Sequence, residues 1–156
     1  MCSVYTSNNA FNWNDKINIG IVFCLLTVGA ASFFVFSKNT TSTATEPKVG
    51  EPIESVLVPD QISEIGLLGK NIFELKCQSC HGINAAGRHE IGPPLVHKIY
   101  EPSHHSDQSF YRAVALGVKS HHWPFGNMAA VEGLTKGDVK AIISYVRELQ
   151  RENGIL

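Results

Sequence analysis

Cys77-Gln78-Ser79-Cys80-His81 is the stretch of this sequence that carries the most specific chemistry. Two thiols three residues apart lie on one turn of a helix, and the imidazole beside the second thiol can bind a metal ion. A redox dithiol and half of a zinc site are the general alternatives. The dithiol is typical of a βαβ context, and the zinc site needs further ligands at short spacing. Neither context is present around this stretch.

Cys-x-x-Cys-His is the attachment pattern of c-type haem, and it occurs once in this chain. Each thiol can form a thioether to a haem vinyl group, while the adjacent histidine reaches the iron from the proximal side. We therefore expect one covalent haem c, attached through Cys77 and Cys80, with His81 as an axial ligand of the iron.

The flanks of the motif predict a small all-α domain. Ahead of it, apolar positions recur at helical spacing: Leu68, Ile72, Phe73 and Leu75. A capping-type signal from Thr135 to Asp138 opens a C-terminal helix, whose apolar positions also repeat: Val139, Ile142, Ile143, Val146 and Leu149. A shorter helix is expected to begin near Ser106 or Asp107, and no alternating strand pattern competes with these helices.

Residues 66–156 resemble a class I cytochrome c, a small all-α fold around one covalently bound haem. Gly69 and Phe73 match positions of the first helix in that family, and Tyr145 matches the aromatic residue of its last helix that packs across them. The stretch Gly92-Pro93-Pro94-Leu95 is similar to the Gly-Pro-x-Leu that follows the haem motif in the family.

The resemblance implies two further site residues. The Pro93 carbonyl would accept a hydrogen bond from Nδ1 of His81, which leaves Nε2 for the iron. Met128 would be the second axial ligand, although Ala129 follows it where the family usually has proline. A bis-histidine haem is the alternative, because the domain has six other histidines: His89, His97, His104, His105, His121 and His122. None of them sits at the family's distal position.

Two histidine pairs, His104-His105 and His121-His122, are unusual in so short a domain. They could form a second metal site, for instance for copper, or a pH-sensitive docking rim. Neighbouring histidines on a helix point about 100° apart, so a metal site needs both pairs to converge. We expect exposed loop histidines with tertiary hydrogen bonds instead. Trp123, Pro124 and Phe125 are expected to pack on the distal face of the haem.

The N-terminal part of the sequence predicts a membrane anchor. Residues 17–37 carry no charge, and as a helix they would span the roughly 30 Å core of a bilayer. We expect a short cytoplasmic segment at 1–16, a single-pass signal anchor at 17–37, a flexible linker at 38–62 and the cytochrome c domain at 63–156. A cleaved signal peptide is the alternative for the apolar run. Within the linker, Val56-Leu57-Val58 is expected to dock on the domain.

A haem whose axial positions are both filled by protein side chains has no open site for oxygen. We therefore expect an electron carrier rather than an enzyme, and a formal net charge of −1 gives no basic footprint for nucleic acid. The resemblance implies a haem domain in the periplasm of a bacterial inner membrane, with a quinol-oxidising complex and a terminal oxidase as redox partners. The alternatives are a subunit of a dehydrogenase or oxidase complex, a haem-based sensor and a copper-handling protein.

Overall fold

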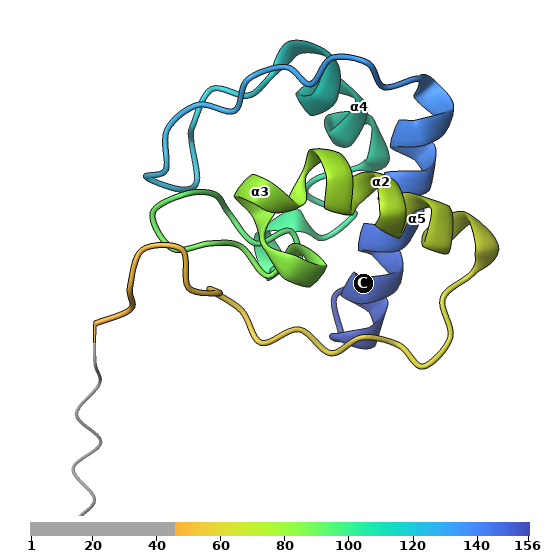
Figure 1. The fold of residues 1–156 in the computed structure, drawn as a ribbon, viewed down its shortest axis with the longest axis horizontal. Helices are drawn as coiled ribbons and strands as arrows, with labels where there is room; N and C mark the ends of the chain where they lie inside the picture. Colours follow the sequence, from red (N-terminus) through yellow and green to blue (C-terminus); the bar gives the residue numbers. More distant parts are fainter. Residues whose placement is uncertain (1–45) are drawn as a thin grey trace, which may run out of the picture. The chain divides into compact units, whose positions relative to one another are not determined.

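Four α-helices and two short 3-10 helices make up residues 46–156, the part of the chain that the computed structural model describes (Figure 1). They follow one another as α2 (Glu64–Lys76), α3 (Gln78–His81), η1 (Ile83–Ala85), η2 (Lys98–Tyr100), α4 (Asp107–Leu116) and α5 (Lys136–Glu152). Two isolated bridges are the only β-type pairing in this range. The all-α prediction is therefore confirmed for these residues.

The predicted N-terminal segment, membrane anchor and first part of the linker lie outside the described residues, at 1–16, 17–37 and 38–45. Over residues 46–156, no helix combines the length and the apolar character needed to cross a membrane.

Polar side chains fix the start of the two longest helices. Ser63 precedes α2, and its hydroxyl accepts a hydrogen bond from the backbone N–H of Gly66 at 3.1 Å. Thr135 and Asp138 form the predicted capping box of α5, in which each side chain bonds the backbone N–H of the other residue. Such caps satisfy backbone groups that the first turn of a helix leaves without partners.

Helices α2 and α5 cross each other, as Figure 1 shows. A Cβ atom added to Gly69 would lie only 1.9 Å from the carbonyl oxygen of Ala141, so the two backbones are in direct contact there. One turn further along α2, the ring of Phe73 packs against Tyr145 with centroids 5.7 Å apart. The aromatic contact between these helices that the resemblance implied is therefore confirmed.

The buried core forms around this crossing: Phe73, Val96, Ile142, Tyr145, Val146, Leu149 and Ile155 are its larger members. Leu68 and Leu75 are instead 53% and 83% exposed. Although their spacing suggested a broad apolar face, α2 buries only the narrow strip that faces α5. The two leucines are seven residues apart and therefore share one face of the helix, turned away from that strip.

The second part of the predicted linker lies on the domain rather than apart from it. The backbone N–H of Glu54 donates to the carbonyl of Ala86 at 2.9 Å. Leu57 exchanges two hydrogen bonds with the side chain of Asn153, at 2.9 and 2.8 Å. Val56 packs against the core, as predicted for this short apolar run. Because of these contacts, the packed unit begins earlier than residue 63. Composition does not reveal such backbone hydrogen bonds.

A buried arginine joins α5 to the turn before α4. Arg147 is only 8% exposed, and its Nε lies 3.0 Å from Asp107. The rest of the guanidinium donates to the carbonyl oxygens of Tyr100 and His105, and the group also lies 5.0 Å from the centre of the Phe110 ring. This bonding pattern satisfies a charge that would otherwise be costly to bury.

The Gly69 contact predicts a strong effect of a single methyl group. Gly69→Ala should lower the free energy of unfolding by roughly 1–3 kcal/mol, because the two backbones must separate to admit it. Gly137→Ala is the matched control within a helix, since its Cβ would meet only the Thr135 hydroxyl at 3.5 Å. The control should leave stability unchanged or raise it by up to about 1 kcal/mol. Denaturant titration of both variants measures the difference, and equal effects would contradict the close crossing.

Candidate haem-binding site

The motif residues lie on one helical turn, as their spacing predicts. Cys77 joins α2 to α3, and its carbonyl oxygen accepts hydrogen bonds from the N–H groups of Cys80 at 3.1 Å and His81 at 2.9 Å. Both cysteines are free thiols. Burial, and secondly the neighbouring Cys80, raises the pKa of the Cys77 thiol to about 11. This thiol is therefore protonated at neutral pH.

The imidazole of His81 is oriented by a backbone carbonyl. Its Nδ1 lies 2.9 Å from the oxygen of Pro93, which is the hydrogen bond that the resemblance implied. Since a carbonyl only accepts, Nδ1 carries the proton and Nε2 keeps its lone pair. Burial lowers the pKa of His81, which also favours the neutral ring. A neutral imidazole with a free Nε2 is the form that binds iron.

A close backbone approach brings Pro93 to this position. A Cβ atom on Gly92 would lie 2.5 Å from the carbonyl oxygen of Cys80, so only glycine lets the loop pass the motif turn at this distance. The next residue then presents its carbonyl to His81. The Gly-Pro pair therefore has a direct geometric role at the site.

One cavity of about 1010 Å³ contains all five residues predicted for the site, since its walls include Cys77, Cys80, His81, Pro93 and Met128. This volume is at the upper end of the roughly 300–1,000 Å³ that is usual for ligand pockets. Most of the remaining wall is apolar and comes from several helices and loops: Phe73, Leu95, Phe110, Val114, Phe125 and Ile142.

The Met128 backbone is held by a short antiparallel pairing. Met128 and Val118 exchange two hydrogen bonds of 2.9 Å each. Gly117, with a φ of 72°, packs so closely that a Cβ atom there would lie 2.4 Å from the carbonyl oxygen of Met128. The loop between Val118 and Met128 also brings the stacked rings of Trp123 and Phe125 to the cavity wall, whereas Pro124 is exposed; their packing on the haem stays a prediction.

These residues fit a covalently attached haem. Two free thiols, an imidazole with an available Nε2 and a thioether line the same apolar cavity. Trp123 adds a further observation, because its buried Nε1–H has no hydrogen-bond partner among the described residues. A polar group of a bound ligand would satisfy this donor. The assignment of each residue to a bond with haem stays a prediction.

Comparison with known proteins gives the class that this fold and site define. The family model "Cytochrome c" matches residues 67–150, which is more than half of the chain. The chain therefore belongs to the cytochrome c family, and the resemblance drawn from the motif and the helices is confirmed. A class I monohaem arrangement fits the single Cys-x-x-Cys-His of the sequence.

The similar curated proteins are much longer than this chain. A cbb3-type cytochrome c oxidase subunit CcoP from Helicobacter pylori (strain ATCC 700392 / 26695) is 35% identical over 79 residues. These residues are 51% of this chain and 25% of that protein. The CcoP protein of strain 52 matches with the same identity and coverage. No solved structure is a significant match to the chain.

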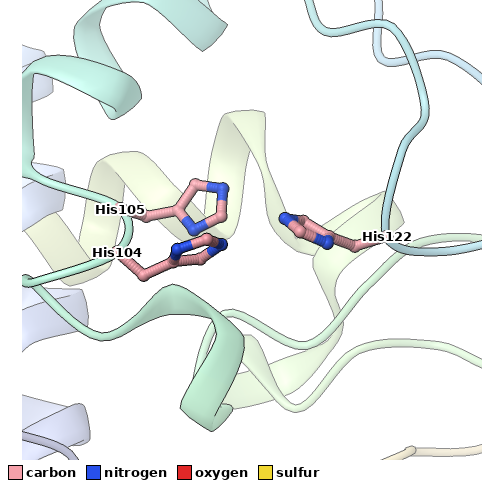
Figure 2. Close-up of side chains that lie close together, drawn as sticks. All are labelled: His104, His105 and His122. Carbon is pink, nitrogen blue, oxygen red and sulfur yellow. The ribbon is translucent and has the colours of Figure 1, made fainter.

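The structure brings together three histidines from the two pairs, which is the condition that a metal site at these residues requires. We call His104, His105 and His122 the histidine cluster; Figure 2 shows their rings directed toward one another. The expectation of exposed loop histidines is confirmed for His104 and His122, whereas His105 is half-buried; their convergence is the feature that the sequence did not reveal. They lie in a turn and a bend rather than on helices, so the angular separation of neighbours on a helix does not apply.

The close packing of Gly117 predicts that the position of Met128 is sensitive to a remote methyl group. Gly117→Ala should weaken the far-red absorption band of a thioether bound to ferric iron, while the haem stays covalently attached. Gly133→Ala is the control, because it has a similar φ of 77° but its Cβ would meet only Lys76 Nζ, at 3.9 Å. Both positions have a positive φ that disfavours a residue with a Cβ, but only at Gly117 would the added atom also meet backbone atoms. Loss of the band in both, or in neither, would contradict the role of Gly117.

Proposed function

We propose that this chain is a membrane-anchored, monohaem cytochrome c that passes single electrons between respiratory-chain complexes on the periplasmic side of a bacterial inner membrane. One observation carries the proposal. His81, oriented by Pro93, lines the same cavity as both thiols and Met128.

Each residue has a defined part in this proposal. Haem, when bound, supplies a one-electron redox centre. Cys77 and Cys80 would hold it by thioether bonds, which keep it on the chain in both oxidation states. His81 and Met128 would fill both axial positions of the iron, which leaves no open position for a substrate. The apolar cavity wall excludes water, and together with a thioether ligand it favours a raised reduction potential.

The membrane part of the proposal is supported by the sequence. The anchor would be the uncharged run at 17–37, which lies outside the described residues. Because part of the expected linker is bonded to the domain through Glu54 and Leu57, the free tether would be shorter than residues 38–62. A short tether raises the effective concentration of an electron carrier near partners in the same membrane. Those partners would be a quinol-oxidising complex as donor and a terminal oxidase as acceptor.

A second candidate is an electron-transfer subunit of an oxidase. The similarity to CcoP proteins, which are named as subunits of cbb3-type cytochrome c oxidase, favours it. The two candidate functions differ in whether the chain stays bound to an oxidase. A subunit stays with oxidase polypeptides through purification in mild detergent, whereas a separate carrier elutes alone and still accepts electrons.

Replacement of Met128 tests the ligand assignment. Met128→Ala should retain covalent haem but lower the reduction potential by on the order of 0.1 V, within the roughly 0.8 V range that axial ligands set. Met128→His is the companion variant, since it offers a ligand of lower potential at the same place and should also remove the far-red band. Potentiometric titration followed by absorption measures both variants. A potential unchanged in Met128→Ala would contradict thioether ligation.

A further inference from the structure

The histidine cluster lies where two loops meet at the rim of the cavity. His104 and His105 belong to the turn before α4, and His122 belongs to the loop that ends at Met128 (Figure 2). One potential ligand atom from each of the three residues lies within 4.8 Å of those of the other two. His121 stands beside them, with its ring centroid 4.2 Å from that of His122.

Hydrogen bonds to backbone carbonyls orient the rings of His105 in the cluster and of His121 beside it. Nδ1 of His105 lies 2.7 Å from the carbonyl oxygen of Ile99, and Nδ1 of His121 lies 2.8 Å from that of Lys119. In each case the carbonyl can only accept, so Nδ1 carries the proton and Nε2 is left with its lone pair. Histidines that bind metal ions usually donate their other ring N–H to an acceptor of this kind.

The backbone under His105 is also fixed. Arg147 of α5 donates to its carbonyl oxygen, and Asp107 pairs with the same guanidinium at 3.0 Å. The carboxylate offsets the positive charge that a bound cation would otherwise meet from this side. His104 and His122 are exposed, so their side chains are free to adjust.

We propose that His104, His105 and His122 bind one divalent transition-metal ion, with Zn²⁺ as the representative ion and water completing its coordination. This site is separate from the haem iron and does not depend on the proposed function. Three imidazoles without carboxylates suit Zn²⁺, Cu²⁺ or Ni²⁺, whereas Ca²⁺ and Mg²⁺ prefer oxygen ligands. Three protein ligands and an open, water-filled position are a known arrangement for zinc.

Binding of one Zn²⁺ ion by the histidine cluster requires only small movements of its side chains. Zinc–nitrogen bonds of about 2.0–2.1 Å place tetrahedral ligand nitrogens roughly 3.3 Å apart. The ligand atoms of the cluster are separated by up to 4.8 Å. Rotation of the exposed His104 and His122 side chains would bring their nitrogens to this separation, while His105 would keep its hydrogen bond to Ile99.

Two imidazoles of the cluster, those of His105 and His122, also favour the neutral form that binds a metal ion. Desolvation, and then the neighbouring histidines, lowers the pKa of His122. Burial is the first cause for His105, whose pKa is lowered in the same direction. At neutral pH a metal ion therefore meets little competition from protons at these two residues.

A metal ion here would connect the turn before α4 with the loop that carries Met128. His105 and His122 line the same cavity as Met128, and His122 precedes it in the loop that the Val118 pairing closes. Occupancy would therefore restrain the segment that supplies the predicted distal ligand.

Zinc binding by the untagged full chain, purified in detergent from cells that attach haem, tests the proposal. Equilibrium dialysis and calorimetry should find one Zn²⁺ per chain with a Kd at or below about 10 µM, unaffected by excess Mg²⁺. His105→Ala and His122→Ala should each weaken binding at least tenfold. His89→Gln is the control, because His89 lies in another loop, paired through its backbone with Glu51.

Two results would overturn the site. One is the absence of saturable zinc binding below about 100 µM in the wild-type chain. The other is an unchanged Kd in both cluster variants, with circular dichroism showing that they remain helical. Zinc bound equally by the wild type, the variants and the control would place the ion elsewhere on the chain.

Discussion

Direct backbone contact between α2 and α5 at Gly69 determines where the site residues lie. The missing side chain lets the Ala141 carbonyl approach, and Phe73 then packs against Tyr145 in the core. The helical hydrogen-bond pattern continues from Phe73 to Cys77, whose N–H donates to the Phe73 carbonyl at 2.8 Å. The turn that carries the two thiols and His81 is therefore an extension of the helix that crosses α5 in direct backbone contact.

The loops around the cavity depend on contacts of the same kind. Gly92 passes the motif turn at a distance that excludes any side chain, and this places the Pro93 carbonyl against His81. Gly117 packs on the Met128 carbonyl and supports the pairing with Val118. Both loops rest on helices that the core holds in place. Such supports keep ligands in one geometry, which favours rapid one-electron transfer with little rearrangement.

The sequence predicted the parts of this structure that local chemistry determines. The haem motif, the capping box at Thr135 and the repeating apolar positions of α5 each depend on residues close together in the chain. The convergence of His104 with His122 and the burial of Arg147 depend on how loops distant in sequence meet, which periodicity does not report. The sequence also did not reveal the backbone hydrogen bonds of Glu54, because a polar linker composition is compatible both with a free segment and with one that packs on the domain.

The central claim is that one covalent haem lies in this cavity between His81 and Met128. Absorption spectra of the detergent-solubilised full chain, oxidised and then reduced, test it most directly. We expect a c-type reduced spectrum, haem that stays on the chain after denaturation, and the weak far-red band of a thioether bound to ferric iron. Covalent haem without that band would contradict Met128 as a ligand. A chain without covalent haem, made in cells that attach it to other proteins, would contradict the account as a whole.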